Sequence, residues 1–162
     1  MTEAPDREAV GTLLRHVLEV LDGDVAAVYA ERGLADYRPR FSPPLRVLVT
    51  DGPLPIRDLA RRVGVTHSAA SQTVAQMARA GLVELTPGAD ARQRIVHLSA
   101  RARELLPVVE AEWAATTEAM RGLDDELPVP LAEMLHAVLA AVRRRSLRQR
   151  IADAGLPPPP VA

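Results

Sequence analysis

Apolar residues recur every three or four positions in long stretches at both ends of the chain, the pattern of amphipathic helices. The N-terminal stretch, residues 6–31, carries its apolar side at Val10, Leu13, Leu14, Val17, Leu18, Leu21, Val25 and Val28. In residues 100–152 the same spacing runs from Leu105 to Met120 and again from Leu131 to Val142. We predict a helix in each stretch. The helix over residues 100–121 has Ser99 as its N-cap and a kink at Pro107, and it stops at Gly122 before a new start at Asp124.

The middle of the chain predicts two shorter helices joined by a tight turn. Leu59, Ala60 and Val63 share one helical face, and Gly64 follows where a left-handed residue would end that helix. Thr66 is suited to cap a second helix over residues 67–80, because its hydroxyl can accept a bond from an unpaired amide. This order is a helix-turn-helix, in which the second helix is shaped to enter the DNA major groove.

The outward side of the helix 67–80 is polar and has no acidic residue. Together with the cap, its candidate DNA-contacting residues are Thr66, His67, Ser68, Ser71, Gln72 and Gln76. Glutamine can pair with adenine edges, and serine can bond to bases or phosphates. Taken alone, such a face is equally compatible with an ordinary solvated helix surface.

A hairpin follows at once. Residues 82–86 and 94–98 read as strands, with a turn-forming loop over 87–93 between them. Arg92 and Arg94 make its tip basic, so the tip could enter a narrow minor groove beside the helix. Asp90 could pair with Arg92 and hold its direction; the alternative is a plain surface hairpin with a weak ion pair. We predict a wing over residues 82–98.

These motifs together resemble the MarR family of bacterial transcription regulators. The likeness rests on Gly81-Leu82-Val83, Asp90-x-Arg92 and Leu98-Ser99 after the helix-turn-helix, and it extends over most of residues 8–145. It implies a mainly α fold with a small β wing, in which long N- and C-terminal dimerisation helices flank a winged helix-turn-helix over residues 42–99. This sequence departs from the family where Gln72 and Gln76 stand in place of an arginine or lysine, which bears on the base sequence read.

Charge is distributed in agreement with this interpretation. The net charge is −1, yet residues 55–103 hold eight arginines and three acids, a local balance of +5, and the remainder carries −6. Positive charge concentrated in the region that would contact DNA is typical of a DNA-binding protein. The run from Arg143 to Arg150 admits three interpretations: a solvated helix end, a partner for the acidic N-terminus of a second subunit, or a DNA contact.

The sequence also predicts what the protein does not do. The chain has no cysteine, its four histidines lack metal-site spacing, and it carries no phosphate-binding loop or nucleophile motif. We therefore expect no metal, no cofactor and no catalysis. No apolar run is long enough to span a membrane and the N-terminus is polar and acidic, so we expect a cytoplasmic protein.

Family resemblance further implies that a small effector, often aromatic or anionic, binds in a cleft. The cleft lies between the dimerisation helices (the arm) and the winged helix-turn-helix over residues 42–99 (the reading head). Three of the four aromatic side chains lie within residues 29–41, near several cations. The candidate pocket residues are His16, Tyr29, Tyr37, Arg38, Arg40 and Phe41. The alternative is that these rings simply fill the joint between arm and head.

We thus predict a homodimeric regulator of transcription that binds a pseudo-palindromic operator in double-stranded DNA and represses until a small ligand relieves it. We call the helix over residues 67–80 the reading helix. The two reading helices of a dimer, about 34 Å apart, would match half-sites one helical turn apart on the DNA. The alternative is a winged-helix protein-interaction module without specific DNA binding. The Pro-rich tail, residues 153–162, is predicted to be extended.

Overall fold

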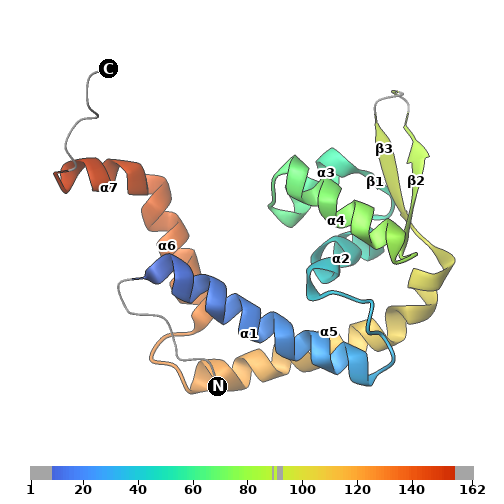
Figure 1. The fold of residues 1–162 in the computed structure, drawn as a ribbon, viewed down its shortest axis with the longest axis horizontal. Coiled ribbons are helices and arrows are strands. Elements are labelled where there is room, and N and C mark those ends of the chain that lie inside the picture. The colour runs from blue at the N-terminus through green and yellow to red at the C-terminus, as the bar shows by residue number, and fades with distance from the viewer. Residues whose placement is uncertain (1–8, 89, 91–92, 156–162) are drawn as a thin grey trace. The chain divides into compact units, whose positions relative to one another are not determined.

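The structure is a computed structural model that describes residues 9–88, 90 and 93–155. The chain divides into two compact units, Met1–Glu110 and Ala111–Ala162. The described residues form α1 (Val10–Glu31), η1 (Pro39–Phe41), α2 (Ser42–Asp51), β1 (Leu54–Pro55), α3 (Ile56–Val63), α4 (His67–Arg79), β2 (Val83–Pro87), β3 (Arg94–Leu98), α5 (Ala100–Asp125), α6 (Leu131–Arg144) and α7 (Leu147–Asp153) (Figure 1). The predicted fold class, mainly helical with a small β wing, is confirmed.

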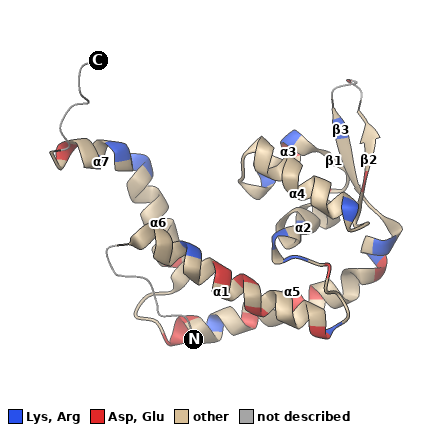
Figure 2. Ribbon diagram, viewed as in Figure 1, with Lys and Arg blue, Asp and Glu red and all other residues tan. Residues whose placement is uncertain are grey.

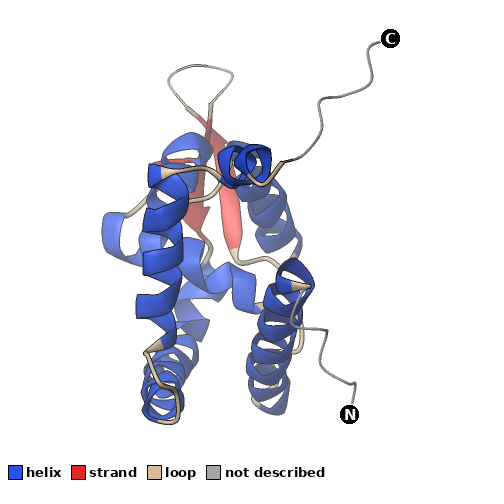
Figure 3. Ribbon diagram, turned by 90° about the vertical axis from the view of Figure 1, so that its left-hand side faces the viewer, coloured by secondary structure: helices blue, strands red, loops and turns tan. Residues whose placement is uncertain are grey.

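The first unit is built around the predicted helix-turn-helix and its hairpin. The sheet, red in Figure 3, is antiparallel with strand order β1-β3-β2. The strand β1 was not predicted, because two residues are too short to show any alternation; it forms where Leu54 pairs with Val96 of β3. Helix α4 packs against α3 and β2, and α2 packs against α3 and β3.

One continuous core supports the reading helix. Its fully buried side chains come from α2, α3, α4 and the sheet: Leu45, Leu59, Val74, Met77 and Val96. Of these, Leu59 belongs to the apolar helical face that was predicted from the sequence. Burial of this side of α4 leaves its polar side outward.

The long C-terminal helix α5 differs from prediction at one interruption. It continues through Gly122 to Asp125, with Pro107 inside it, and the N-terminal helix α1 includes Gly23. The predicted stop at Gly122 is therefore wrong: a glycine costs a helix only about 1 kcal/mol, which other interactions can offset. The predicted new start at Asp124 is also wrong, because Asp124 lies inside α5 and the next helix, α6, begins at Leu131. The Asp124 Oδ1 does accept a hydrogen bond from the backbone N–H of Leu131 at 2.8 Å, so this side chain contacts the start of α6.

The C-terminal basic run ends one helix and begins another. The chain leaves helical geometry at Arg145, and Ser146 caps α7 with a capping box completed by Gln149. Arg150 donates to the carbonyl oxygens of Ala141 and Arg145 at the end of α6. These contacts support the helix-end interpretation of the run. Within the described residues, none of the helices has the length and apolar character needed to cross a membrane.

Candidate nucleic-acid interface

The turn between α3 and α4 forms at the two residues predicted from the sequence, Gly64 and Thr66. Gly64 adopts a left-handed conformation with φ of 79°, and its N–H donates to the carbonyl of Ala60 at 2.9 Å. Thr66 Oγ1 accepts from the backbone N–H of Ala69 at 3.2 Å, the predicted N-cap. These local bonds fix the angle at which α4 leaves α3.

Helix α4 presents most of the predicted contact residues to solvent. Thr66, His67, Ser68 and Gln72 are exposed, and Ser71 is half-buried. Arg79, in the last turn, is exposed as well. The face therefore offers hydrogen-bond donors and acceptors with no carboxylate to repel phosphates.

Gln76 lies elsewhere than the sequence suggested. It is half-buried, and its Oε1 is shielded from solvent without a hydrogen-bond partner among the described residues. The side chain borders a hollow between α4, α5 and the segment before α2 rather than the exposed face. It sits at the margin of the polar face, where helical spacing alone does not separate outward from inward.

The hairpin forms at the predicted place, shifted by one residue in its first strand. Val83 pairs with Leu98 and Pro87 with Arg94, and Arg94 is exposed near the tip. The Gly88 N–H donates to the Gln93 carbonyl at 3.0 Å and closes the loop. Asp90 is exposed, whereas Arg92 lies outside the described residues, so their pairing stays a prediction.

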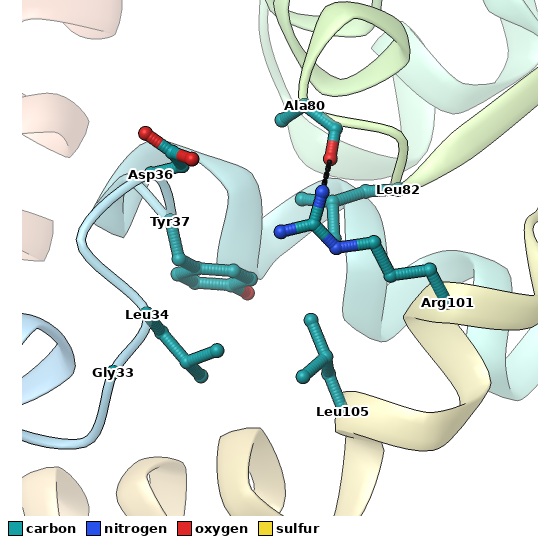
Figure 4. Close-up of a pocket in the computed structure, with 8 residues that line it drawn as sticks. All are labelled: Gly33, Leu34, Asp36, Tyr37, Ala80, Leu82, Arg101 and Leu105. Carbon is teal, nitrogen blue, oxygen red and sulfur yellow. Dashed lines mark hydrogen bonds between the residues drawn. The ribbon is translucent and has the colours of Figure 1, made fainter.

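The end of α4 is joined to the start of α5 by Ser99. Its Oγ donates to the Gly81 carbonyl at 2.6 Å and accepts from the Ala102 N–H at 3.0 Å. It therefore caps α5, as predicted, while holding the residue that follows the reading helix. Arg101 adds a second link, with Nη1 donating to the Ala80 carbonyl at 2.8 Å (Figure 4).

Several arginines of the basic region have acidic partners. Arg57 and Arg61 both pair with Asp58 within α3. Arg62 forms a two-bond pair with Asp51 at the end of α2, at 2.6 and 2.8 Å. Such exposed pairs contribute little to stability, but they reduce the positive charge that α3 offers to DNA. The basic residues of the described chain are blue in Figure 2.

The aromatic residues proposed for an effector pocket pack against one another. Tyr29, Tyr37 and Phe41 are at most 4% exposed. The ring centroids of Tyr29 and Tyr37 are 4.3 Å apart, and those of Tyr37 and Phe41 are 5.8 Å apart. This arrangement supports the alternative, in which the rings fill the joint, because a buried cluster leaves little room for a ligand.

The described residues of the first unit line at least three hollows. A cavity of about 30 Å³ is lined by Leu34, Tyr37, Leu82, Arg101 and Leu105 among others (Figure 4), with room for roughly two waters. An apolar pocket of about 190 Å³ lies between α2, α3 and α4. An open, polar hollow of about 410 Å³ is bordered by Arg38, Arg40, Phe41, Gln76, Arg79 and Arg101. His16 and Tyr29 line none of the three.

Comparison with known proteins supplies independent information. A sequence model described as MarR family matches residues 45–94, from α2 to the hairpin. The chain is similar to the M. tuberculosis transcriptional regulator MOSR in complex with DNA (24% identity, TM-score 0.64, 85% of this chain and 98% of that one). It is also similar to a probable transcriptional regulator from Pseudomonas aeruginosa (25% identity, TM-score 0.54, 82% and 96% covered).

A third similar structure contains a small molecule. PcaV, a transcriptional regulator from Streptomyces coelicolor, was solved with its natural ligand; it shares 18% identity at a TM-score of 0.60, over 96% of this chain and 100% of that one. No curated protein sequence matches the chain. The match to the family model covers the helix-turn-helix and most of the hairpin, the elements that carry the candidate interface.

Proposed function

Because this chain belongs to the MarR family of winged helix-turn-helix transcriptional regulators, which are not enzymes, we propose that it is a homodimeric repressor of transcription. It binds a pseudo-palindromic operator in double-stranded DNA and releases it when a small ligand binds. The observation that carries the proposal is the exposed, acid-free face of α4 beside a hairpin with exposed Arg94. This pairing suits one helix in the major groove and a basic tip in the minor groove.

Dimerisation is supported by apolar surface that a single chain leaves in water. Val10, Leu14, Val17 and Leu18 of α1 are exposed, as are Met134, Leu135, Val138, Leu139 and Val142 of α6. An apolar stripe of this length on a helix is typical of an interface with another helix. A twofold dimer would supply two reading helices for two half-sites.

Relatives supply further support. The similar M. tuberculosis regulator is in complex with DNA, and PcaV is in complex with a natural ligand. A ligand changes DNA affinity only if it binds the DNA-competent and DNA-incompetent arrangements with different affinities. We therefore expect effector binding and DNA binding to oppose each other in this protein.

The proposal is tested by fluorescence anisotropy on duplex DNA from the region upstream of its own coding sequence. A scrambled duplex of equal length serves as control, at several salt concentrations. We expect one dimer per site, a clear preference for the specific duplex and a steep loss of affinity with salt. Weak and equal binding to both duplexes would instead support a protein-interaction module.

Replacing Arg92 with alanine is expected to weaken DNA binding at least several-fold while leaving the melting temperature unchanged. The substitution removes a positive charge from the loop between the two strands, where minor-groove and phosphate contacts would be made. Anisotropy titration measures the affinity, and circular dichroism checks the fold. An unchanged dissociation constant for the folded variant would rule out this role for the hairpin.

Replacing Gln72 with alanine is expected to reduce the preference for specific over random DNA more than it reduces non-specific affinity. Gln72 is exposed on α4 and can make a two-bond contact with an adenine edge, worth about 1–3 kcal/mol of discrimination. Competition titrations with both duplexes give the ratio. Equal losses on the two duplexes would argue against a base contact by Gln72.

A further inference from the structure

We propose that the open hollow beside the reading helix binds a small, polyvalent, hydrophilic anion carrying carboxylate or phosphate groups. The hollow holds about 410 Å³, within the range of small-ligand sites. Four arginines border it: Arg38, Arg40, Arg79 and Arg101. Binding itself does not depend on the proposed function; only its consequence for DNA does.

The four arginines come from three separate parts of the first unit. Arg38 and Arg40 lie just before and within η1, Arg79 ends α4, and Arg101 lies in the first turn of α5. No ion pair within the described residues includes any of them. Asp36 is the one carboxylate of the lining. Tertiary structure has therefore gathered an excess of three positive charges around one concavity.

This excess distinguishes the hollow from the group of arginines on α3. On α3, Arg57, Arg61 and Arg62 each have a carboxylate within ion-pair distance. Like charges held together repel one another, and an anion between them removes that cost. The guanidinium group presents paired N–H donors that match carboxylate and phosphate oxygens, so arginine is the side chain best suited to such a ligand.

Two further groups would orient the ligand. Gln76 borders the hollow with an enclosed, unbonded Oε1, which could accept a hydrogen bond from a ligand hydroxyl. Arg101 donates one N–H to the Ala80 carbonyl oxygen, and a guanidinium group has five N–H donors. Arg101 can therefore bind an anion while its hydrogen bond to the end of α4 remains. A hydroxylated polycarboxylate fits this combination of cations and one acceptor.

The other two hollows do not suit such a ligand. The cavity beside Tyr37 has room for roughly two waters. The pocket between α2, α3 and α4 is lined mainly by apolar side chains, with Arg40 its one charged residue. A hydrophilic anion would lose its hydration there without enough partners to replace it.

Occupation of the hollow bears on DNA binding because Gln76 and Arg79 belong to the reading helix. A polyvalent anion there would neutralise Arg79 and place negative charge beside the surface that faces phosphates. We expect it to lower DNA affinity about five-fold or more, the usual lower range of coupling between two sites. By reciprocity, DNA would lower the affinity for the anion by the same factor.

The anion site is tested first without DNA. Isothermal titration calorimetry of the full-length protein with citrate, and separately with pyrophosphate, is expected to show saturable binding of one anion per chain. Sodium chloride at matched ionic strength is expected to give no saturable signal. Arg40→Gln should lower the affinity at least ten-fold. Arg103→Gln should change it less than two-fold, because Arg103 is exposed on α5 but borders none of the hollows.

Absence of saturable binding by both probes would overturn the proposal, as would equal affinity in the Arg40→Gln protein with circular dichroism like that of wild type. Arg79→Gln gives a second test should the first variant fail to fold. Anion titration into the protein–DNA complex then examines regulation. Displacement by citrate or pyrophosphate in wild type, but not in Arg40→Gln, supports the coupling.

Different results contradict the anion site and the proposed DNA-binding function. If the protein binds the anion but no DNA, the anion site is supported and the proposed function is contradicted. If neither probe binds, while Arg40→Gln weakens DNA binding and lowers its salt dependence, the hollow contacts a backbone phosphate and the anion site is overturned.

Discussion

Val138→Arg is expected to convert the proposed homodimer into monomers and to lower operator affinity about a hundred-fold. Val138 lies within the exposed apolar stripe of α6 and is 49% exposed in the single chain. In a twofold interface each substitution occurs twice, and a charge buried among apolar side chains carries a large desolvation cost. Loss of the second reading head removes the gain from binding two half-sites at once.

Analytical ultracentrifugation at micromolar concentration measures the first effect, and anisotropy titration the second. His136→Arg provides the matched control: it adds a charge to the same helix, at an exposed position away from the apolar stripe. The control is expected to stay dimeric. A Val138→Arg protein that sediments as a dimer would show that this side of α6 is not the interface.

Met77→Ala is expected to destabilise the folded protein by about 2–5 kcal/mol, the usual range for truncating a large buried side chain. Met77 is on the inward side of α4 and has no exposed surface. Its removal leaves a cavity beneath the reading helix, whose lining side chains lose contacts with nothing to replace them. At fixed protein concentration the melting temperature should fall by roughly 4–20 °C.

Leu85→Ala is the appropriate comparison, because it also truncates an apolar side chain but at a position that is 39% exposed. It should shift the stability by no more than about 0.5 kcal/mol. Differential scanning calorimetry of the two variants beside wild type separates them. Equal melting temperatures for Met77→Ala and Leu85→Ala would mean that α4 is not held by the core described above.

The candidate DNA-contacting face and the arginine-lined hollow both include residues of α4. The same hydrogen bonds hold the end of this helix in place for both. Ser99 and Arg101 bond to Gly81 and Ala80, so the start of α5 holds the end of α4. A change in the position of α5 would therefore reach the reading helix through two hydrogen bonds rather than through the core alone. This gives the proposed response to a ligand a definite physical link.

The sequence by itself determined the helix-turn-helix and the hairpin. Gly64, Thr66 and Ser99 act on backbone groups within a few residues of themselves, so their turn and caps could be predicted from local chemistry. Helical spacing likewise identified the buried side of α3, at Leu59 and Ala60, and the polar side of α4. The outward face of α4 followed, from Thr66 to Gln72.

Tertiary structure alone decided the remaining features. Gln76 is enclosed because the segment before α2 and the start of α5 lie beside it, and the four arginines of the hollow are brought together from positions 38 to 101. The pair Leu54–Pro55 is a strand only because β3 is adjacent. Each depends on which distant residues become neighbours, and spacing along the chain carries no information about that.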